Sequence, residues 1–199
     1  MNESKSVIRL GILGGTFDPI HEGHLALAHA AIDQLKLDRV IFVTAFRHPL
    51  ADKQNATVAS AQDRCEMAKL ATQGEPKFEV SDCEVKRKGI SYTVDTLKEF
   101  RRLYPKPNEI FFLTGGDWGK SLNQWKDIET IFSLVRFVVA KRPGFDTRNL
   151  PQKVEFLDFV PLDVSSTEIR SQLKQGKTLA SLIPEVVSDY IHKRQLYRS

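Results

Sequence analysis

The chain of 199 residues is 41% hydrophobic and 27% charged, with a formal net charge of +4. This length suits a globular fold that buries roughly 70% of the surface of its unfolded chain, so we expect a single domain over residues 1–199 with a small helical portion from about residue 164. The composition excludes a membrane-spanning protein, because no apolar run approaches the ~20 residues that cross a bilayer, and the first residues lack a signal-peptide core, so we expect a cytoplasmic protein.

The first predicted element is a strand over residues 7–13, followed by a glycine-rich loop and a helix over residues 25–36. The loop reads GGTFDPIHEGH over residues 14–24. Its glycines leave no side chain between the backbone amides and a ligand, and the helix N-terminus offers unpaired N–H groups and a partial positive charge to an anion. His21 and His24 add two hydrogen-bond donors. The loop therefore predicts a phosphate-binding site.

Further along the chain, apolar β-branched runs alternate with amphipathic ones. Strands are predicted at residues 40–43, 110–113 and 137–140, and helices at residues 61–71 and 128–134. Strands that alternate with helices imply crossover connections, so we predict an α/β fold with a doubly wound, Rossmann-like parallel sheet and helices on both faces. In such sheets ligands bind beyond the carboxyl ends of the strands, where we expect the loops after these strands to converge.

Two other segments carry signals of their own. The connection over residues 45–60 is longer than the usual roughly two to six residues of a strand-to-helix loop, and we interpret it as a substrate lid. Residues 164–175 are expected to form a helix, with Ser165 and Glu168 in capping-box spacing, a pattern that by itself indicates a capped helix and that is compatible with a second anion site. A last helix is predicted over residues 185–193.

The two histidines permit three interpretations. A metal site would need a third ligand, but His21 and His24 lie three residues apart and His29 falls off their helical face, so we predict no dedicated metal site. As a structural alternative, both histidines could cap the helix. The glycines before them favour the third interpretation, in which both imidazoles donate hydrogen bonds to phosphate. Asp18, beside Pro19, is better explained as a turn residue than as a catalytic acid.

These motifs resemble those of one enzyme family. Residues 14–24 are similar to the GGTFDPIHxGH signature of the HxGH nucleotidyltransferases, in the version carried by the nicotinate-mononucleotide adenylyltransferases, and SSTEIR, residues 165–170, resembles the ISSTxIR motif of the same superfamily. The resemblance implies that His21, His24 and Arg170 are the catalytic residues, which hold the ATP polyphosphate and stabilise charge while the α-phosphorus is attacked.

The resemblance also implies two groups of binding residues. ATP is expected to contact three segments: the glycine-rich loop, the loop KRPG at residues 141–144 and the SSTEIR segment. The expected contact residues are Gly14, Gly15, Thr16, Phe17, His21, His24, Lys141, Arg142, Ser165, Ser166, Thr167 and Arg170. The mononucleotide is expected to contact Thr16, Phe17, His48, Tyr92, Thr93, Asp117 and Trp125. One departure from the family pattern is Ala51, where a lysine is expected after the second strand, and Arg47 or Lys53 could supply the missing charge.

Together the motifs imply an enzyme that transfers the adenylyl group of ATP to nicotinate mononucleotide, forming nicotinate adenine dinucleotide and pyrophosphate in NAD biosynthesis. Mg²⁺ is the implied cofactor, held mainly by the substrate phosphates, because no acidic cluster in the sequence looks like a dedicated cage. The attacking phosphate is already anionic, so no general base is needed. A homo-oligomer is compatible with these features.

Two alternatives stay open at this point. The acceptor could instead be nicotinamide mononucleotide or another phosphorylated compound, because the altered connection at residues 45–60 would contact it. A catalytically silent nucleotide-sensing or nucleic-acid-binding domain would fit the basic charge. The intact His21, His24 and Arg170 argue against this last alternative, and we expect no specific nucleic-acid partner.

Overall fold

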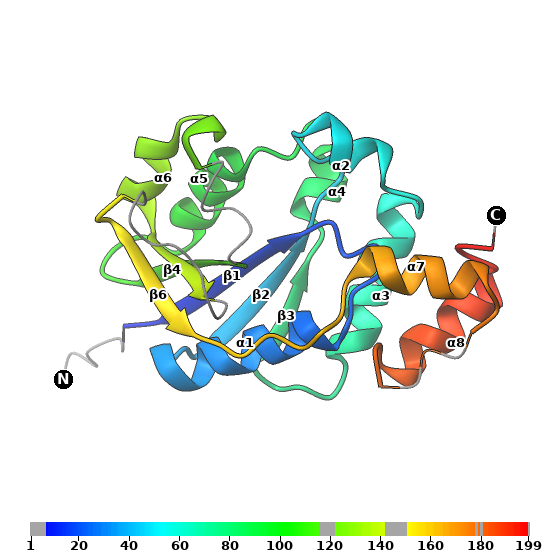
Figure 1. Cartoon of the computed structure of the whole chain (residues 1–199). Helices are drawn as coiled ribbons and strands as arrows, with labels where there is room; N and C mark the ends of the chain where they lie inside the picture. Colours follow the sequence, from blue (N-terminus) through cyan, green and yellow to red (C-terminus); the bar gives the residue numbers. More distant parts are fainter. Residues whose placement is uncertain (1–6, 116–121, 142–150, 178, 180, 199) are drawn as a thin grey trace.

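The computed structural model describes residues 7–115, 122–141, 151–177, 179 and 181–198, and it contains one six-stranded sheet (Figure 1). The strands are β1 (Arg9–Gly15), β2 (Arg39–Thr44), β3 (Phe78–Ser81), β4 (Glu109–Gly115), β5 (Arg136–Lys141) and β6 (Val154–Asp158). All neighbouring strands pair in parallel, in the order β3-β2-β1-β4-β5-β6. The order reverses between β1 and β4, so the predicted doubly wound, Rossmann-like α/β fold is confirmed.

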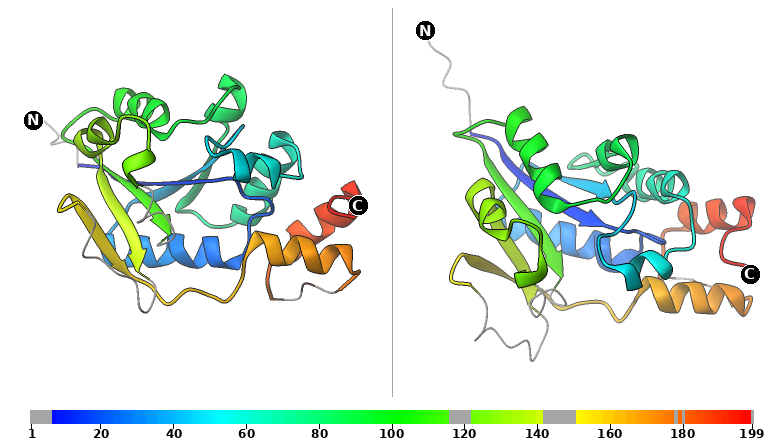
Figure 2. Two further views of the ribbon diagram at one scale, coloured as in Figure 1. Left: turned by 45° about the horizontal axis from the view of Figure 1, so that its top comes forward. Right: turned by 90° about the horizontal axis from the view of Figure 1, so that it is seen from above.

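Helices cover both faces of the sheet (Figures 1 and 2). The layer on one face comprises α1 (Glu22–Leu35) and α3 (Ala61–Thr72), which α7 (Ser166–Lys174) and α8 (Glu185–Arg194) extend sideways. The layer on the other face comprises α5 (Thr93–Leu103) and α6 (Ile128–Leu134). The connections hold two short helices, α2 (Ala51–Asn55) and α4 (Cys83–Arg87), and the 3-10 turn η2 (Leu122–Gln124). No helix of the described residues is long and apolar enough to cross a membrane.

The central strands are apolar on both faces, which explains why they stand out in the sequence as continuous apolar runs. On β4, Ile110 and Phe112 belong to the core beneath α5 and α6, whereas Phe111 and Leu113 belong to the core beneath α1 and α3. Successive side chains of a strand point to opposite faces, so one strand contributes to both cores. The carboxyl ends of the central strands are thereby held rigidly at one edge of the sheet.

The structure differs from the predictions in several places. Helix α1 begins at Glu22 rather than at residue 25, so the HEGH segment lies at the helix N-terminus. Strands β3 and β6 are absent from the prediction, because these edge strands mix apolar with polar side chains. The connection over residues 45–60 contains α2 and is not a structureless loop. Its action as a lid stays a prediction.

Candidate active site

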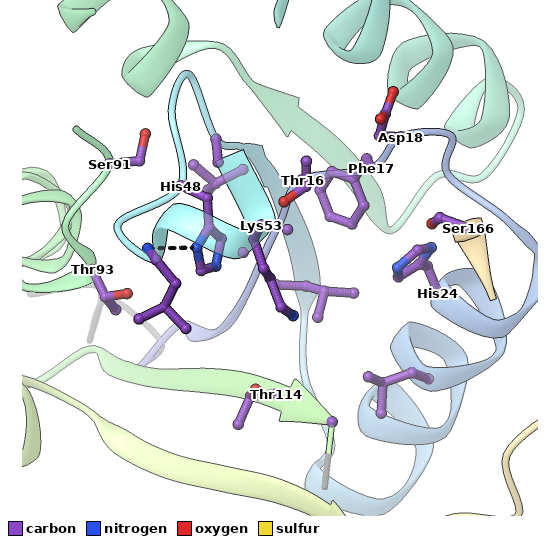
Figure 3. A pocket seen from close by; sticks show the side chains of 18 of the residues that line it. Thr16, Phe17, Asp18, His24, His48, Lys53, Ser91, Thr93, Thr114 and Ser166 are labelled. Atoms are coloured by element: carbon purple, nitrogen blue, oxygen red, sulfur yellow. Dashed lines mark hydrogen bonds between the residues drawn. The ribbon is translucent and has the colours of Figure 1, made fainter. Parts of the chain in front are cut away.

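A cavity of about 700 Å³ lies at the carboxyl ends of β1, β2 and β4, where the strand order reverses. Figure 3 shows His24 and Ser166 on one side of this cavity, Ser91 and Thr93 on the other, and Lys53 between them. We call the first side the phosphate end, defined by His21, His24, Ser166, Thr167 and Arg170. We call the second side the aromatic end, defined by Tyr92, Thr93, Phe112, Trp125 and Lys126.

Strand β1 delivers the glycine-rich loop to this cavity. Gly14, Gly15, Thr16 and Phe17 all line it. Gly15 has no room for a side chain, because a Cβ there would lie 2.5 Å from the Phe17 ring. Phe17 is only 2% exposed, and its ring meets the His24 ring edge to face with centroids 5.0 Å apart. A bound nucleotide would therefore meet the backbone of Phe17 rather than the ring.

The first turn of α1 places both motif histidines at the phosphate end. The imidazoles of His21 and His24 stack, with centroids 3.7 Å apart. Nδ1 of His24 accepts a 3.2 Å hydrogen bond from the backbone N–H of His21. A neutral imidazole that accepts at Nδ1 carries its proton on Nε2, so His24 keeps one N–H donor for a ligand.

Desolvation decides the charge of both histidines. Burial lowers the pKa of His21 to about 4. The pKa of His24 lies well below its usual value, first because of desolvation and second because of the neighbouring His21. Both imidazoles are therefore neutral at pH 7. The buried Nδ1 of His21 has no hydrogen-bond partner among the described residues, which marks it as a group that a ligand could satisfy.

Helix α7 brings the SSTEIR motif against the glycine-rich loop. Ser166 Oγ donates a 3.0 Å hydrogen bond to the carbonyl oxygen of Pro19, which lies 147 residues away in the sequence. Arg170 Nη1 donates a 2.7 Å hydrogen bond to the carbonyl oxygen of Asp18. As predicted, Ser165 caps the helix, and its Oγ accepts a 3.2 Å hydrogen bond from the N–H of Glu168. The imidazoles and the guanidinium thus share one cavity.

Asp18 organises the loop through its carboxylate. Oδ2 accepts a 2.8 Å hydrogen bond from the N–H of Val58, and Oδ1 accepts one of 3.0 Å from the N–H of Ala59. The phenol of Tyr197 donates a further 2.7 Å hydrogen bond to Oδ1. Because both oxygens are occupied and the residue is 2% exposed, the geometry agrees with the expectation that Asp18 forms the turn and is not a catalytic acid.

The aromatic end is an extension of the core beneath α5 and α6. Tyr92, Thr93 and Trp125 line the cavity here. The Trp125 ring meets Phe112 and Phe137 edge to face, at centroid distances of 5.8 and 5.7 Å. The position of Trp125 is therefore compatible both with packing in the core and with its predicted place in the mononucleotide pocket.

Several residues of the lining were missed in the sequence. The ammonium of Lys126 lies 4.2 Å from the centroid of the Tyr92 ring and 3.3 Å from Oδ2 of Asp95, and its only sequence signal is its place next to the predicted tryptophan. Glu84 is buried, accepts a hydrogen bond from the Thr96 hydroxyl and has its pKa raised by desolvation. The other missed polar residues of this region include Ser91 and Thr114.

Helix α2 supplies a positive charge close to the position where the family pattern expects one. Residue 51 is alanine, but Lys53, two residues later, lines the cavity, whereas Arg47 is not among its described lining residues (Figure 3). Of the two substitutes considered from the sequence, the structure thus places Lys53 at the site. His48 also lines the cavity, and its Nδ1 accepts a 3.0 Å hydrogen bond from the N–H of Leu50. Burial and then the charge of Lys53 lower the pKa of His48 to about 4.

Three predicted binding residues are not placed at the cavity. Lys141, at the end of β5, is not among the described lining residues, and its ammonium lies 4.6 Å from the centroid of the Phe156 ring. Arg142 and Asp117 lie outside the described residues. Their contacts with nucleotide stay predictions.

The cavity offers few groups that could bind a metal ion. Asp18 and Glu84 are the carboxylates among the lining residues that the structure describes, and both already accept hydrogen bonds. Within the described ranges there is no group of three or more His, Cys, Asp or Glu side chains that could hold an ion. This donor set does not form a cage for Mg²⁺, but it suits an ion that arrives bound to substrate phosphates.

The fold is Rossmann-like, and its cavity lies beside the N-terminus of α1 at the switch point of the sheet, the usual position of a ligand in such folds. The sequence profile of the cytidylyltransferase-like family matches residues 12–172. A relative from Desulfitobacterium hafniense, named "Probable nicotinate-nucleotide adenylyltransferase", is 43% identical over an alignment of 209 positions, which covers all of both chains. One of the same name from Thermus thermophilus is 45% identical over 192 residues, which cover 96% of this chain and all of the relative.

A solved structure shares the fold over nearly the whole chain. It is the Plasmodium falciparum nicotinic acid mononucleotide adenylyltransferase complexed with NaAD, with a TM-score of 0.78 and 22% identity over 96% of this chain and 97% of that one. Because the identity is only 22%, this similarity shows a shared fold and nothing more. On the sequence matches, the chain belongs to the cytidylyltransferase-like family and, within it, to the nicotinate-nucleotide adenylyltransferases.

Proposed function

We propose that the protein transfers the adenylyl group of ATP to nicotinate mononucleotide, forming nicotinate adenine dinucleotide and pyrophosphate, a step of NAD biosynthesis. The observation that carries this proposal is that the phosphate end and the aromatic end meet in one cavity, with Lys53 between them. The reaction needs donors for a polyphosphate and flat apolar surface for a pyridine ring next to each other, and the two ends supply them. The names of the relatives at 43% and 45% identity support the same activity.

The reaction is an in-line substitution at phosphorus. An oxygen of the mononucleotide phosphate attacks the α-phosphorus of ATP, and a new P–O bond forms while the bond to the bridging β-phosphate oxygen breaks. Pyrophosphate leaves with that electron pair. The attacking oxygen is anionic at neutral pH, so no residue has to remove a proton from it. Catalysis then depends on positioning and on stabilisation of charge, which suits a site without an activated nucleophile.

The phosphate end would receive the polyphosphate of ATP. Neutral His21 and His24 can each donate an N–H without first being protonated, and a bound polyphosphate would raise their pKa values by favouring the charged form. The Arg170 guanidinium presents a planar fork of donors that matches phosphate oxygens. The backbone amides at the N-terminus of α1 add a partial positive charge.

The aromatic end would receive the mononucleotide. Tyr92 and Trp125 offer flat apolar surfaces on which a pyridine ring can pack. The hydroxyl of Thr93 and the ammonium of Lys126 line the same end and are donors that would complement the carboxylate of nicotinate. Lys53, between the two ends, would meet phosphate rather than the ring.

Mg²⁺ is proposed as part of the ATP substrate rather than as an ion held by a protein cage. It would be bound by phosphate oxygens and water, and it would neutralise charge on the leaving pyrophosphate. The protein's own contribution is to bind and orient the phosphates through the imidazoles and the guanidinium, with the partial positive charge of the α1 N-terminus beside them.

An assay with the purified protein tests this proposal directly. The protein is incubated with ATP, Mg²⁺ and either nicotinate or nicotinamide mononucleotide, and pyrophosphate release is measured. We expect turnover with both, with kcat/KM at least about ten-fold higher for the acid, which corresponds to about 1.4 kcal/mol of discrimination. A preference for the amide would overturn the choice of acceptor. ATP binding without turnover on either mononucleotide would favour the catalytically silent alternative.

A further inference from the structure

The segment that follows α8 places a buried phenol beside the phosphate end. Tyr197 is 3% exposed, and its Oη donates a 2.7 Å hydrogen bond to Oδ1 of Asp18. This buried bond joins residues 179 positions apart in the sequence. Desolvation and then the charge of Asp18 raise the pKa of Tyr197. The phenol therefore stays protonated and remains a donor wherever the protein is folded.

Asp18 connects this phenol to Arg170. The carbonyl oxygen of Asp18 accepts the 2.7 Å hydrogen bond from Arg170 Nη1, and Oδ2 of its carboxylate lies 3.8 Å from the same nitrogen. The backbone N–H groups of Val58 and Ala59 also donate hydrogen bonds to this carboxylate. The phenol of Tyr197 is the neutral side-chain donor that completes this arrangement. Arg170 is thus held by a loop residue whose own orientation depends on the segment after α8.

We propose that Tyr197 is a positioning residue for ATP binding: through Asp18 it holds Arg170 and the turn before His21 in the arrangement that receives the polyphosphate. Tyr197 is not among the described residues that line the cavity, so it acts without touching substrate. The inference rests on the proposed function in one respect, namely that the phosphate end binds ATP. Without the hydroxyl, Oδ1 of Asp18 loses a buried hydrogen bond, and small displacements of a charged donor weaken phosphate binding strongly.

A purely structural role makes a different prediction. Tyr197 would then anchor the segment after α8, and loss of its hydroxyl would lower stability without changing ATP binding. Tyr190 provides a matched control, because its phenol donates a 2.9 Å hydrogen bond to Oδ1 of Asp63, where α3 and α8 pack together. Neither residue of this second pair is among the described lining residues. Both Tyr→Phe changes remove one phenol–carboxylate hydrogen bond and keep the ring.

The test compares Tyr197→Phe with Tyr190→Phe in the full chain. Binding of ATP with Mg²⁺ is measured by calorimetry, KM for each substrate by steady-state kinetics, and Tm by thermal unfolding. For Tyr197→Phe we expect ATP binding and kcat/KM for ATP to fall about ten-fold, while KM for the mononucleotide changes less than about two-fold. For Tyr190→Phe we expect a smaller decrease in Tm, because this bond is only partly buried and Asp63 keeps Ser60 and Arg194 as partners, and unchanged ATP binding. Unchanged ATP binding in Tyr197→Phe would overturn the proposal.

A double variant tests the route through Arg170. If Tyr197 acts on this guanidinium, Tyr197→Phe should weaken ATP binding much less in an Arg170→Lys background than in the wild type. If the fold-changes in ATP affinity of the two single variants simply multiply in the double variant, Tyr197 does not act through Arg170. A wild-type protein that binds ATP but turns over neither mononucleotide would refute the proposed function alone, since the Tyr197 comparison is still made on ATP binding. A wild-type protein that does not bind ATP would refute both.

Discussion

The two ends of the cavity are held in place by different kinds of contact. At the phosphate end, segments distant in sequence are joined by polar contacts, such as the hydrogen bonds from Ser166 and Arg170 to loop carbonyl oxygens. At the aromatic end, the lining side chains are continuous with the hydrophobic core, as in the packing of Trp125 against Phe112 and Phe137. The same cavity therefore combines a hydrogen-bonded region with a region of core packing.

This difference separates the contributions to rate and to stability. A net hydrogen bond contributes about 1 kcal/mol to folding, whereas a donor aimed at developing charge can contribute about 3 kcal/mol or more to the barrier. Burial of a large aromatic ring acts mainly on folding, at roughly 25 cal/mol per Å² of apolar surface. Changes at the phosphate end should thus affect turnover far more than stability, and changes at the aromatic end should affect both.

His24→Ala is the strongest test of this separation. The variant loses the Nε2 donor, and we expect kcat to fall about 10³-fold, which corresponds to about 4 kcal/mol. The free energy of unfolding should decrease by about 1 kcal/mol, because one hydrogen bond and a ring contact are lost. Steady-state kinetics and urea unfolding measure the two quantities. A stability loss above about 3 kcal/mol with a proportionate loss of active protein would instead favour a capping role.

Trp125→Ala should show the opposite balance. We expect the free energy of unfolding to fall by about 2–3 kcal/mol, at the lower end for large-to-small changes because the side chain is only half-buried. KM for the mononucleotide should rise several-fold through the lost ring contact, with KM for ATP little changed. If KM for ATP rises equally, the two ends do not bind separate substrates, and the comparison between them fails.

The sequence predicts much of this fold because the central strands are apolar on both faces. Residues 40–43 and 110–113 lie within β2 and β4, and they are visible as unbroken apolar runs. The edge strands escape prediction, since Glu79 in β3 and Glu155 in β6 interrupt their apolar pattern and form ion pairs at the sheet margin. Half-buried strands of four or five residues leave too little periodicity to recognise.

The motifs of the site are predictable, and so is the meeting of the glycine-rich loop with SSTEIR at one cavity, but the contacts of Asp18 and the position of Lys53 are not. The residue types of the glycine-rich loop indicate phosphate chemistry, whereas SSTEIR by itself is a helix-capping pattern and indicates phosphate chemistry only together with that loop. No local pattern indicates that Asp18 accepts hydrogen bonds from Val58 and Tyr197, because those contacts depend on how α3 and α8 pack. The position of Lys53 depends on the short helix α2, which a count of residues along an assumed loop cannot reveal.

Because the buried histidines are neutral in the folded protein, we expect the free energy of unfolding to depend on pH. Folding lowers the pKa of His21 to about 4, from 6.5, so between these values the unfolded chain binds a proton that the folded protein does not. The contribution of His21 to the free energy of unfolding should therefore be complete above about pH 6.5. As the pH decreases toward 4, this contribution should be lost, which lowers the free energy of unfolding by roughly 2–3 kcal/mol. Urea unfolding across this range measures it. His21→Asn should reduce this dependence by the His21 contribution and leave those of His24 and His48, and an unchanged slope would mean that His21 is not held as a neutral imidazole.

The smallest expected effect concerns Lys126, at the aromatic end. Nicotinate and nicotinamide mononucleotides differ by one negative charge on the pyridine substituent, so a nearby ammonium should favour the acid. The side chain of Lys126 is 49% exposed and pairs with Asp95 at 3.3 Å, so screening and that carboxylate reduce its contribution. We expect Lys126→Met to lower the ratio of kcat/KM for the acid over the amide by about two- to five-fold, or up to about 1 kcal/mol.

Lys98→Met is the matched control for that change, because Lys98 is a similarly exposed lysine that pairs with Asp127 at 3.7 Å and is not among the described lining residues. It removes the same charge from the protein, so a general effect of net charge on substrate binding would appear in both variants. A shift in the acid-to-amide ratio confined to Lys126→Met would show that the aromatic end selects by charge as well as by packing. Equal ratios in both variants would mean that this end recognises nicotinate without the ammonium, and that the charged contacts of the cavity belong to the phosphate end and Lys53.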